Sequence, residues 1–175
     1  MADQDPTRNP DFLHYSVDRD LTYPCEPLFE IAADVERYPE FLPGWKAVRT
    51  KPDAEADYAT DQMLAFGPVR ERFTSKVTLH PEERRIDVEY IDGPFRYLNN
   101  HWAFHQAEDG GCIVDFYVDF EFKSRVLQRL IGLLFNEAVR RMVAAFEARA
   151  RQLYGGRETT SKTLEVSSDL ATSSR

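Results

Sequence analysis

The chain has 175 residues, of which 42% are hydrophobic, and its formal net charge is -8 at pH 7. This length suits one domain of roughly 140 to 150 residues with a single hydrophobic core. The acidic balance disfavours a DNA-binding protein, because affinity for phosphate backbones comes mostly from Lys and Arg, and no stretch approaches the ~20 apolar residues of a membrane span.

Both ends of the chain are short of large apolar side chains. Residues 1–11 and the Ser/Thr-rich residues 156–175 therefore have little to offset the entropy of ordering, and we expect two disordered tails around a domain at 12–155. The first residues resemble neither a signal peptide nor a transit peptide, which favours a cytoplasmic location. Cys25 and Cys112 are too few for a disulfide framework and fit a reducing compartment, but the sequence leaves open whether they pair.

The folded region is predicted to begin with a strand and two short helices. Residues 14–21 alternate apolar and polar side chains as a half-buried strand does. Pro24 and Pro27 suit the first turn of a helix, because proline there loses no hydrogen bond. The prolines of residues 38–43 (YPEFLP) then limit the next helix to about one turn, ending before Trp45.

A series of antiparallel strands joined by tight turns is predicted for residues 45–123. The predicted strands cover residues 45–50, 60–66, 69–79, 86–90, 95–106 and 114–122. The last strand has the clearest pattern, since Val114, Phe116, Val118, Phe120 and Phe122 alternate with polar or charged residues. One face of this strand must be buried, and we expect the other, with Asp115, Asp119 and Glu121, to be solvated.

One long helix is predicted for residues 124–154. Its apolar side chains recur at intervals of three and four, so one face is expected to cover the sheet. Gly132 lies inside this helix, where glycine costs ~1 kcal/mol relative to alanine, and predicts a kink or a close approach. The fold class is therefore α+β: a strand, two short helices, about six further strands and a long C-terminal helix.

Motifs for catalysis or metal binding are scarce. His101 and His105 share a strand face but stand ~13 Å apart, too far for one metal. The acidic residues of the last strand are most simply its solvated side, and the glycines form no phosphate-binding loop. Tyr90 and Arg19 are the loose candidates for acid-base chemistry, so we expect neither a catalytic nor a metal site.

Aromatic residues are abundant, with twelve Phe, eight Tyr and two Trp. A well-packed core explains each of them singly. Together they also permit an apolar cavity between the sheet and the long helix, of the kind that binds small molecules through apolar walls and a few polar groups. Asn100, Ser75 and Asn136 lie within apolar patterns and are the candidates for those groups.

Basic residues gather near the long helix. Residues 123–157 hold eight Lys or Arg against two Glu, a balance of +6, so the rest of the chain carries -14. The helix dipole favours cations only near the C-terminal end and leaves those near the N-terminal end unexplained. A solvated face is one reading, and a docking surface for anionic lipid or RNA is the other. The candidate docking residues are Lys123, Arg125, Arg129, Arg140 and Arg141.

Five motifs in order resemble the coenzyme Q-binding family of START-like proteins, within the polyketide cyclase/dehydrase and lipid transport superfamily. They are DVERYPEFLP (34–43), RERFTSKVTL (70–79), DGPFRYL with HWAF (92–98 and 101–104), VDFYVDFEFKSR (114–125) and FNEAVRRMVAAFEARA (135–150). The resemblance spans about residues 12–155. Gly44 departs from the family pattern by separating the YPEFLP motif from Trp45, which leaves open whether Trp45 reaches the mouth of the tunnel.

The resemblance implies a helix-grip fold, in which a curved antiparallel sheet of about six to seven strands wraps around the long helix and encloses a hydrophobic tunnel. It also implies a carrier or chaperone that binds ubiquinone or a related isoprenoid lipid as ligand, requires no cofactor and supports respiration without catalysis. Peripheral contact with the inner membrane is compatible with such a role. The tunnel walls are predicted to include Phe41, Leu42, Trp45, Phe73, Trp102, Phe104, Phe116, Phe135, Met142 and Phe146.

Two other functions remain open. Bacterial relatives in the resembled family include a ribosome association toxin, so a regulator that binds the large ribosomal subunit is the alternative. An enzyme of the polyketide cyclase type is disfavoured, because few ionisable residues are predicted to face inward. The sequence does not indicate the oligomeric state.

Overall fold

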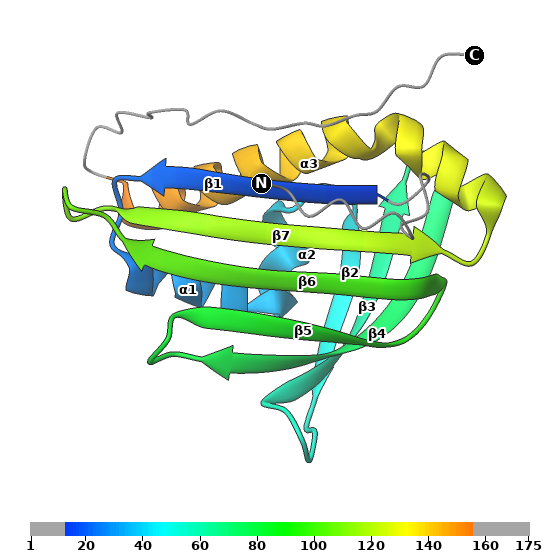
Figure 1. The fold of residues 1–175 in the computed structure, drawn as a ribbon, viewed down its shortest axis with the longest axis horizontal. Coiled ribbons are helices and arrows are strands. Elements are labelled where there is room, and N and C mark those ends of the chain that lie inside the picture. Colours follow the sequence, from blue (N-terminus) through cyan, green and yellow to red (C-terminus); the bar gives the residue numbers. More distant parts are fainter. Residues whose placement is uncertain (1–12, 156–175) are drawn as a thin grey trace, which may run out of the picture.

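The computed structural model describes residues 13–155, with side chains described from residue 21 onward. The two predicted tails lie outside these residues. Seven strands form one antiparallel sheet in the order β1-β7-β6-β5-β4-β3-β2, and α3 runs along it (Figure 1). The strands are β1 (Leu13–Leu21), β2 (Trp45–Lys51), β3 (Tyr58–Phe66), β4 (Val69–His80), β5 (Arg85–Asp92), β6 (Phe95–Gln106) and β7 (Cys112–Phe122).

The helices are α1 (Cys25–Ala33), the 3₁₀ turn η1 (Val35–Arg37), α2 (Tyr38–Phe41) and α3 (Arg125–Tyr154). The Ser124 hydroxyl accepts a hydrogen bond from the Leu127 amide at 3.3 Å, which caps the start of α3. Leu42, after α2, has extended backbone, so the proline-rich segment ends its helix where the sequence predicted. The predicted order of elements is confirmed.

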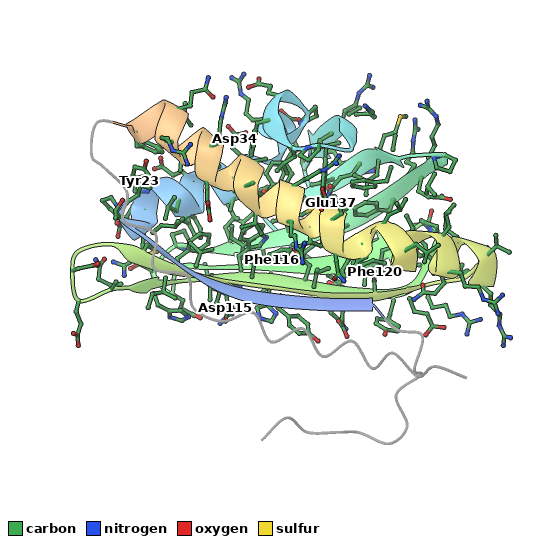
Figure 2. All side chains as sticks on the ribbon, turned by 90° about the horizontal axis from the view of Figure 1, so that it is seen from above. Tyr23, Asp34, Asp115, Phe116, Phe120 and Glu137 are labelled. Atoms are coloured by element: carbon green, nitrogen blue, oxygen red, sulfur yellow. A yellow bond between two sulfur atoms is a disulfide. The ribbon has the colours of Figure 1, made fainter. Side chains whose placement is uncertain are left out.

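Alternation along the strands decides which side chains face α3. In β7, Phe116 and Phe120 are buried and lie between the sheet and α3, whereas Asp115 lies on the other side of the sheet (Figure 2). The same period of two places Phe73, Ser75 and Val77 of β4 inward. The inner face of the curved sheet and one face of α3 therefore share the core.

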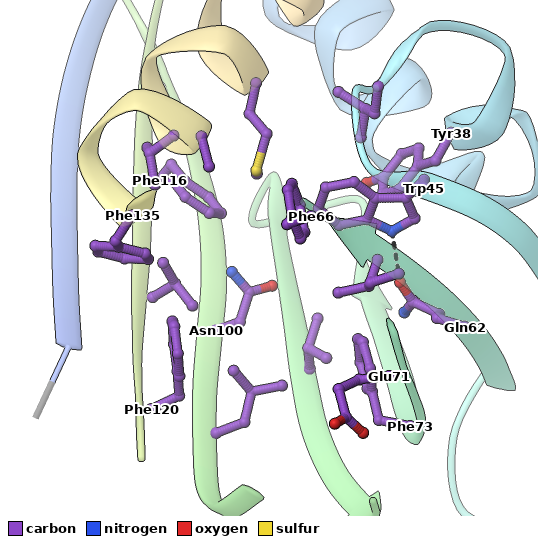
Figure 3. Close-up of a pocket in the computed structure, with 18 of the residues that line it drawn as sticks. Tyr38, Trp45, Gln62, Phe66, Glu71, Phe73, Asn100, Phe116, Phe120 and Phe135 are labelled. Carbon is purple, nitrogen blue, oxygen red and sulfur yellow. Dashed lines mark hydrogen bonds between the residues drawn. The ribbon is translucent and has the colours of Figure 1, made fainter. Parts of the chain in front are cut away.

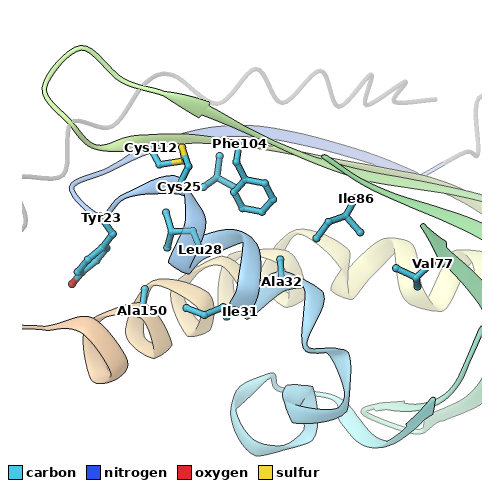
Figure 4. Packing of buried hydrophobic residues seen from close by; sticks show 11 residues of the cluster. Tyr23, Cys25, Leu28, Ile31, Ala32, Val77, Ile86, Phe104, Cys112 and Ala150 are labelled. Atoms are coloured by element: carbon cyan, nitrogen blue, oxygen red, sulfur yellow. A yellow bond between two sulfur atoms is a disulfide. The ribbon is translucent and has the colours of Figure 1, made fainter. Parts of the chain in front are cut away.

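A disulfide bond joins Cys25, at the start of α1, to Cys112, at the start of β7. The sequence left this pairing open, and the structure shows a bond rather than the two free thiols that a reducing compartment favours. Around the disulfide, Leu28, Ile31 and Phe104 form one buried cluster (Figure 4). The bond thus ties the start of α1 to β7, the strand next to the edge strand β1.

Two further buried clusters complete the core. One packs the first half of α3, with Ile131 and Phe135, against Phe120 and neighbouring aromatic rings of the sheet. The other surrounds Tyr38 and Leu42 near α2. Because the three clusters approach from different sides, side chains from all of them border the space between the sheet and α3.

The close approach predicted at Gly132 is not found. Gly132 is exposed, and α3 continues through it without interruption. Among the helices at 13–155, none combines the length and low charge that a membrane crossing requires.

Candidate ligand cavity

A cavity of about 190 Å³ lies between the inner face of the sheet and α3. Strands β3 to β7 supply one wall, α3 supplies the roof, and residues from α1 to the start of β2 close one side. Figure 3 shows side chains from these elements converging on one space. Most of the lining is apolar, so the cavity favours a hydrophobic guest.

Eight of the ten residues predicted as tunnel walls line this cavity. They are Leu42, Trp45, Phe73, Trp102, Phe116, Phe135, Met142 and Phe146. Alternation and helical period pointed these side chains inward, and the structure brings them together. Whether they bind a ligand stays a prediction.

The other two predicted wall residues lie elsewhere. Phe41 turns toward Phe146, with ring centroids 5.3 Å apart, and its ring lies under the Arg149 guanidinium. Phe104 packs edge-on against Phe29 and borders a separate space of about 50 Å³. Both rings pack against neighbouring side chains, and neither of them lines the main cavity.

Trp45 lines the cavity and directly follows a glycine of unusual conformation. Gly44 has a φ of +90°, and a Cβ atom there would lie 2.3 Å from the Phe66 ring. Only glycine fits such a turn without strain. The residue that departs from the family pattern therefore lets the Phe66 ring pack closely against the turn that leads into Trp45, and both rings line the cavity.

A connected set of polar side chains occupies one side of the cavity. Trp45 Nε1 donates to Gln62 Oε1 at 2.9 Å, and Gln62 Nε2 donates to the Thr60 hydroxyl at 3.0 Å. That hydroxyl lies 3.1 Å from the Ser75 hydroxyl. Thr60, Gln62 and Ser75 are buried, and mutual hydrogen bonds satisfy them, as buried polar groups require.

The three polar groups suggested by the sequence have different positions. Asn100 lines the cavity from the middle of β6. Ser75 is fully buried and bonded to Thr60 behind the lining, whereas Asn136 is exposed on α3. Sequence reasoning missed Gln62, because β3 has a weak strand pattern.

Glu71 is the lining residue with a carboxylate. It precedes Phe73 by two positions on β4, so the alternation that predicted Phe73 inward also predicts Glu71 inward. The Glu71 side chain is half-buried and lies beside Phe73 near the β3–β4 end of the cavity (Figure 3). The sequence therefore contains a signal that places Glu71 in the lining.

Tyr38 is the other ionisable residue of the lining. Its hydroxyl donates to the Ala32 carbonyl at 2.5 Å, and burial raises the pKa of the phenol far above its ordinary value. Burial also raises the pKa of Tyr58, whose hydroxyl donates to the Ala33 carbonyl at 2.6 Å. Both phenols therefore stay protonated at neutral pH and hold the end of α1 in place.

One prediction about the outer face of the sheet is wrong. Asp119 was expected to be solvated, but it is only 2% exposed. It lies on β7, an inner strand of the sheet, opposite Asn99 of β6 in register. Glu121 is also largely covered and pairs with Arg96 at 3.4 Å.

The other chemical candidates form no site. Tyr90 accepts a hydrogen bond from the Phe95 amide at 3.2 Å. His101 stacks on Tyr117, with ring centroids 5.0 Å apart. Within the described part of the chain, no group of His, Cys, Asp and Glu has the arrangement of a metal site. The side chain of Arg19 lies outside the described side chains.

The predicted docking residues all lie exposed, four of them on the first two thirds of α3. The Lys123 ammonium donates to the Gly93 carbonyl at 2.9 Å, and Arg141 pairs with Glu137 at 2.9 Å.

Two bulky aliphatic side chains lie among these basic residues: Val126 and Leu133, which are 77% and 85% exposed. This face of α3 points away from the cavity, because the buried residues Ile131 and Phe135 occupy the opposite face.

Comparison with known proteins identifies similar chains. The family model described as "Polyketide cyclase / dehydrase and lipid transport" matches residues 21–147. The ribosome association toxin RatA of Pseudomonas aeruginosa is 34% identical over 135 residues, which cover 77% of this chain and 93% of the toxin. The mitochondrial coenzyme Q-binding protein COQ10 homolog B of Xenopus laevis is 31% identical over 150 residues, 83% of this chain and 61% of that protein.

A solved structure supports the fold. A START superfamily protein from Mycobacterium smegmatis superposes with a TM-score of 0.67 and 19% identity, over 81% of this chain and 98% of that chain. At this identity the likeness shows the fold alone. The predicted helix-grip architecture is confirmed.

Proposed function

The chain belongs to the polyketide cyclase/dehydrase and lipid transport family, as its motifs predicted, and we propose that it binds ubiquinone or a related isoprenoid lipid without catalysing a reaction. In this role it is a carrier or chaperone that supports respiratory electron transport. The observation that carries the proposal is the apolar cavity of about 190 Å³ with few polar groups. The identity to a protein named as coenzyme Q-binding supports the choice of ligand.

The size of the cavity sets what it can hold. An apolar protein cavity of about 150 Å³ takes up a benzene ring, so about 190 Å³ accommodates one substituted ring or a short stretch of isoprenoid chain. Burial contributes ~0.8 kcal/mol per CH₂, so one five-carbon isoprene unit contributes roughly 3 to 4 kcal/mol. Part of a ligand inside the cavity is therefore enough for stable binding.

Mass spectrometry of organic extracts tests the proposal directly. Protein purified without detergent is expected to release a quinone or another isoprenoid lipid in an amount close to one per chain. Protein that yields no lipid, and that does not bind a short-tailed quinone added afterwards, would contradict the proposal.

A pair of variants locates the binding in the cavity. Ala138 lines the cavity from α3, whereas Ala144 on the same helix is exposed. Ala138→Phe fills the space and is expected to lower the affinity for a short-tailed quinone at least tenfold, while Ala144→Phe leaves it unchanged. Equal affinities of the two variants, measured by calorimetric titration, would show that the ligand binds elsewhere.

Association with the ribosome is the second candidate function. The toxin RatA, 34% identical to this chain, carries this association in its name, and the exposed basic face of α3 is the surface suited to RNA. Arg129 and Arg140 are exposed and form no ion pair with another described side chain. Co-sedimentation with ribosomes at moderate salt, abolished by Arg129→Glu with Arg140→Glu, would favour this function.

The same face suits a membrane surface, because Val126 and Leu133 are exposed among the arginines. Aliphatic side chains add affinity for a lipid surface but little for RNA. Flotation with vesicles that contain anionic lipid is therefore measured beside the ribosome assay. Leu133→Ser is expected to weaken vesicle binding and to leave ribosome binding unchanged.

An enzymatic function of the cyclase type has less support. Acid-base catalysis requires groups that exchange protons with a substrate, and the ionisable residues of the lining are Glu71 and Tyr38. The Tyr38 hydroxyl donates its hydrogen to the Ala32 carbonyl, and burial raises the pKa of the phenol. We therefore propose a binding function rather than catalysis.

A further inference from the structure

Asn100 is a polar residue in the middle of an apolar wall. It belongs to the inner face of β6, two positions from both Leu98 and Trp102, which also line the cavity. Its partners in register are Val88 of β5 and Val118 of β7, and both line the cavity as well. The Asn100 amide therefore has aliphatic and aromatic side chains on every side within the sheet.

The hydrogen bonds of Asn100 are incomplete. Nδ2 donates one hydrogen bond, to the Tyr117 carbonyl at 3.0 Å, and this bond identifies the nitrogen end of the amide. A carboxamide carries a second N–H and an oxygen with two lone pairs. Among the described residues, neither of these groups has a partner, whereas both ends of the Gln62 amide are bonded.

The free groups of Asn100 face the cavity. Figure 3 shows the amide pointing into the space bordered by Phe66, Phe116 and Phe135. A polar group left without a partner in apolar surroundings is destabilising, and a ligand that supplies the missing partner recovers that free energy on binding. The wall is thus complementary to a guest that is apolar except for oxygen atoms.

We propose that Asn100 is the polar anchor of the cavity and binds the oxygenated ring of a benzoquinone-type headgroup. Its free N–H donates to a carbonyl or ether oxygen of the ring, and its oxygen accepts from a hydroxyl. Because donor and acceptor stand side by side on one amide, the anchor accommodates both the quinone and the hydroquinone form. This inference rests on the proposed function and adds which end of the ligand lies inside.

The dimensions of the cavity agree with a ring bound inside. The volume of about 190 Å³ is modestly larger than one that holds benzene. Trp102 and Phe116 offer aromatic faces to a ring. Leu134 lines the cavity and is 38% exposed, so the tail is expected to leave beside it, toward the surface at the β3–β4 turn.

Matched variants on one strand test the anchor. Asn100→Leu removes the amide and keeps the number of side-chain heavy atoms, and Asn99→Leu makes the same change at an exposed position on the outer face. The probes are 2,3-dimethoxy-5-methyl-1,4-benzoquinone, which has no tail, and toluene, which has no oxygen. Loss of one hydrogen bond is expected to lower the affinity of Asn100→Leu for the quinone about tenfold. Asn99→Leu should match the original protein with both probes, and Asn100→Leu should not lose affinity for toluene, which distinguishes loss of the hydrogen bond from loss of space.

A measurement on the unaltered protein keeps the test decisive if Asn100→Leu does not fold. In ¹⁵N-labelled protein, the side-chain amide signals of Asn100 are expected to shift with the quinone and to stay in place with toluene. Quinone binding that leaves both these signals and the affinity of Asn100→Leu unchanged would overturn the anchor but not the proposed function. Absence of binding by the unaltered protein, for the tailless and a short-tailed quinone alike, would overturn both.

Discussion

Tyr38 connects the short helices to the cavity through a single buried side chain. Its hydroxyl bonds to the Ala32 carbonyl, and its ring contacts Trp45 and Phe146 edge-on, with centroids 6.1 and 5.6 Å away. Burial raises the pKa of the phenol, so the folded protein keeps the proton where an unfolded chain releases it. Folding stability is therefore linked to pH in the alkaline range.

Tyr38→Phe is expected to change this pH dependence. An unfolded tyrosine loses its proton near pH 10, while folded Tyr38 retains it, so the stability contributed by the neutral phenol is full below pH 10 and falls as pH rises. Above pH 10 the free energy of unfolding should fall less steeply in Tyr38→Phe, by about 1.4 kcal/mol per pH unit. Below pH 10 the variant should be about 1 kcal/mol less stable, because the hydrogen bond is lost. Parallel profiles in urea unfolding between pH 8 and 11 would contradict this.

Gly44 is expected to tolerate no side chain. Gly44 and Gly110 have similar φ values, +90° and +86°, but a Cβ at Gly44 would overlap the Phe66 ring, while at Gly110 it would meet nothing within 4 Å. Gly110→Ala should lower the free energy of unfolding by about 1 kcal/mol, the cost of the backbone conformation. Gly44→Ala should cost more and also weaken quinone binding, since Phe66 must move. Equal losses of unfolding free energy in the two variants, measured by urea unfolding, would show that the Phe66 ring moves aside without cost.

At the scale of the element, α3 combines two different faces. Ile131, Phe135 and Val139 are buried against the sheet, while the outer face carries arginines and exposed aliphatic residues. Gly132 belongs to the exposed part, so packing gives no reason for a glycine there. Replacing Gly132 should therefore change the free energy of unfolding only through helix propensity.

Gly132→Ala is expected to stabilise the protein. Alanine in an exposed helix interior is about 1 kcal/mol better than glycine, and Gly132 does not line the cavity. The free energy of unfolding should rise by that amount, and the affinity for a short-tailed quinone should stay constant. A variant that is less stable or binds less tightly would show that Gly132 has a role in bending α3.

At the scale of the whole molecule, the disulfide joins parts that are distant in sequence. Cys25 and Cys112 are separated by 87 positions, and their Cα atoms lie 5.0 Å apart. A bond across so long a loop restricts the unfolded chain strongly. It also holds α1 against the strands that form the cavity wall.

Reduction of this bond is expected to lower the free energy of unfolding by about 2 to 4 kcal/mol. Urea unfolding with and without dithiothreitol measures the difference. The double variant Cys25→Ser with Cys112→Ser should resemble the reduced protein and should not respond to dithiothreitol. Identical unfolding curves for the original protein under both conditions would mean that the bond does not form in solution.

Most of the fold follows from periodicity in the sequence. The alternation in β4 and β7 and the three-four spacing in α3 predicted which side chains turn inward, and these elements lie where they were expected. The same alternation gave the wrong environment for Asp119, because it separates the two faces of a strand but does not indicate whether neighbouring strands cover the outer one.

The cavity itself was less predictable. Phe41 and Phe104 were predicted as walls, yet they pack against Phe146 and Phe29 and do not line the main space. A void is the difference between the volume that the backbone encloses and the volume that the side chains fill, and periodicity gives neither volume. Glu71 was predictable from its spacing to Phe73, whereas the incomplete hydrogen bonding of Asn100 required the structure.

The attachment of α3 has a mechanical consequence. Near its start, Gln128 Oε1 accepts from the Phe122 amide at 2.8 Å, and near its end Arg149 pairs with Glu40 at 3.1 Å. The side chains that press on the sheet between these points are apolar, and apolar contacts have no preferred direction. The position of α3 on the sheet is therefore fixed by directional bonds near its two ends, while packing alone sets the position of its middle. The middle of α3 is therefore the part of the roof that can shift to fit a guest while its two ends stay in register with the sheet.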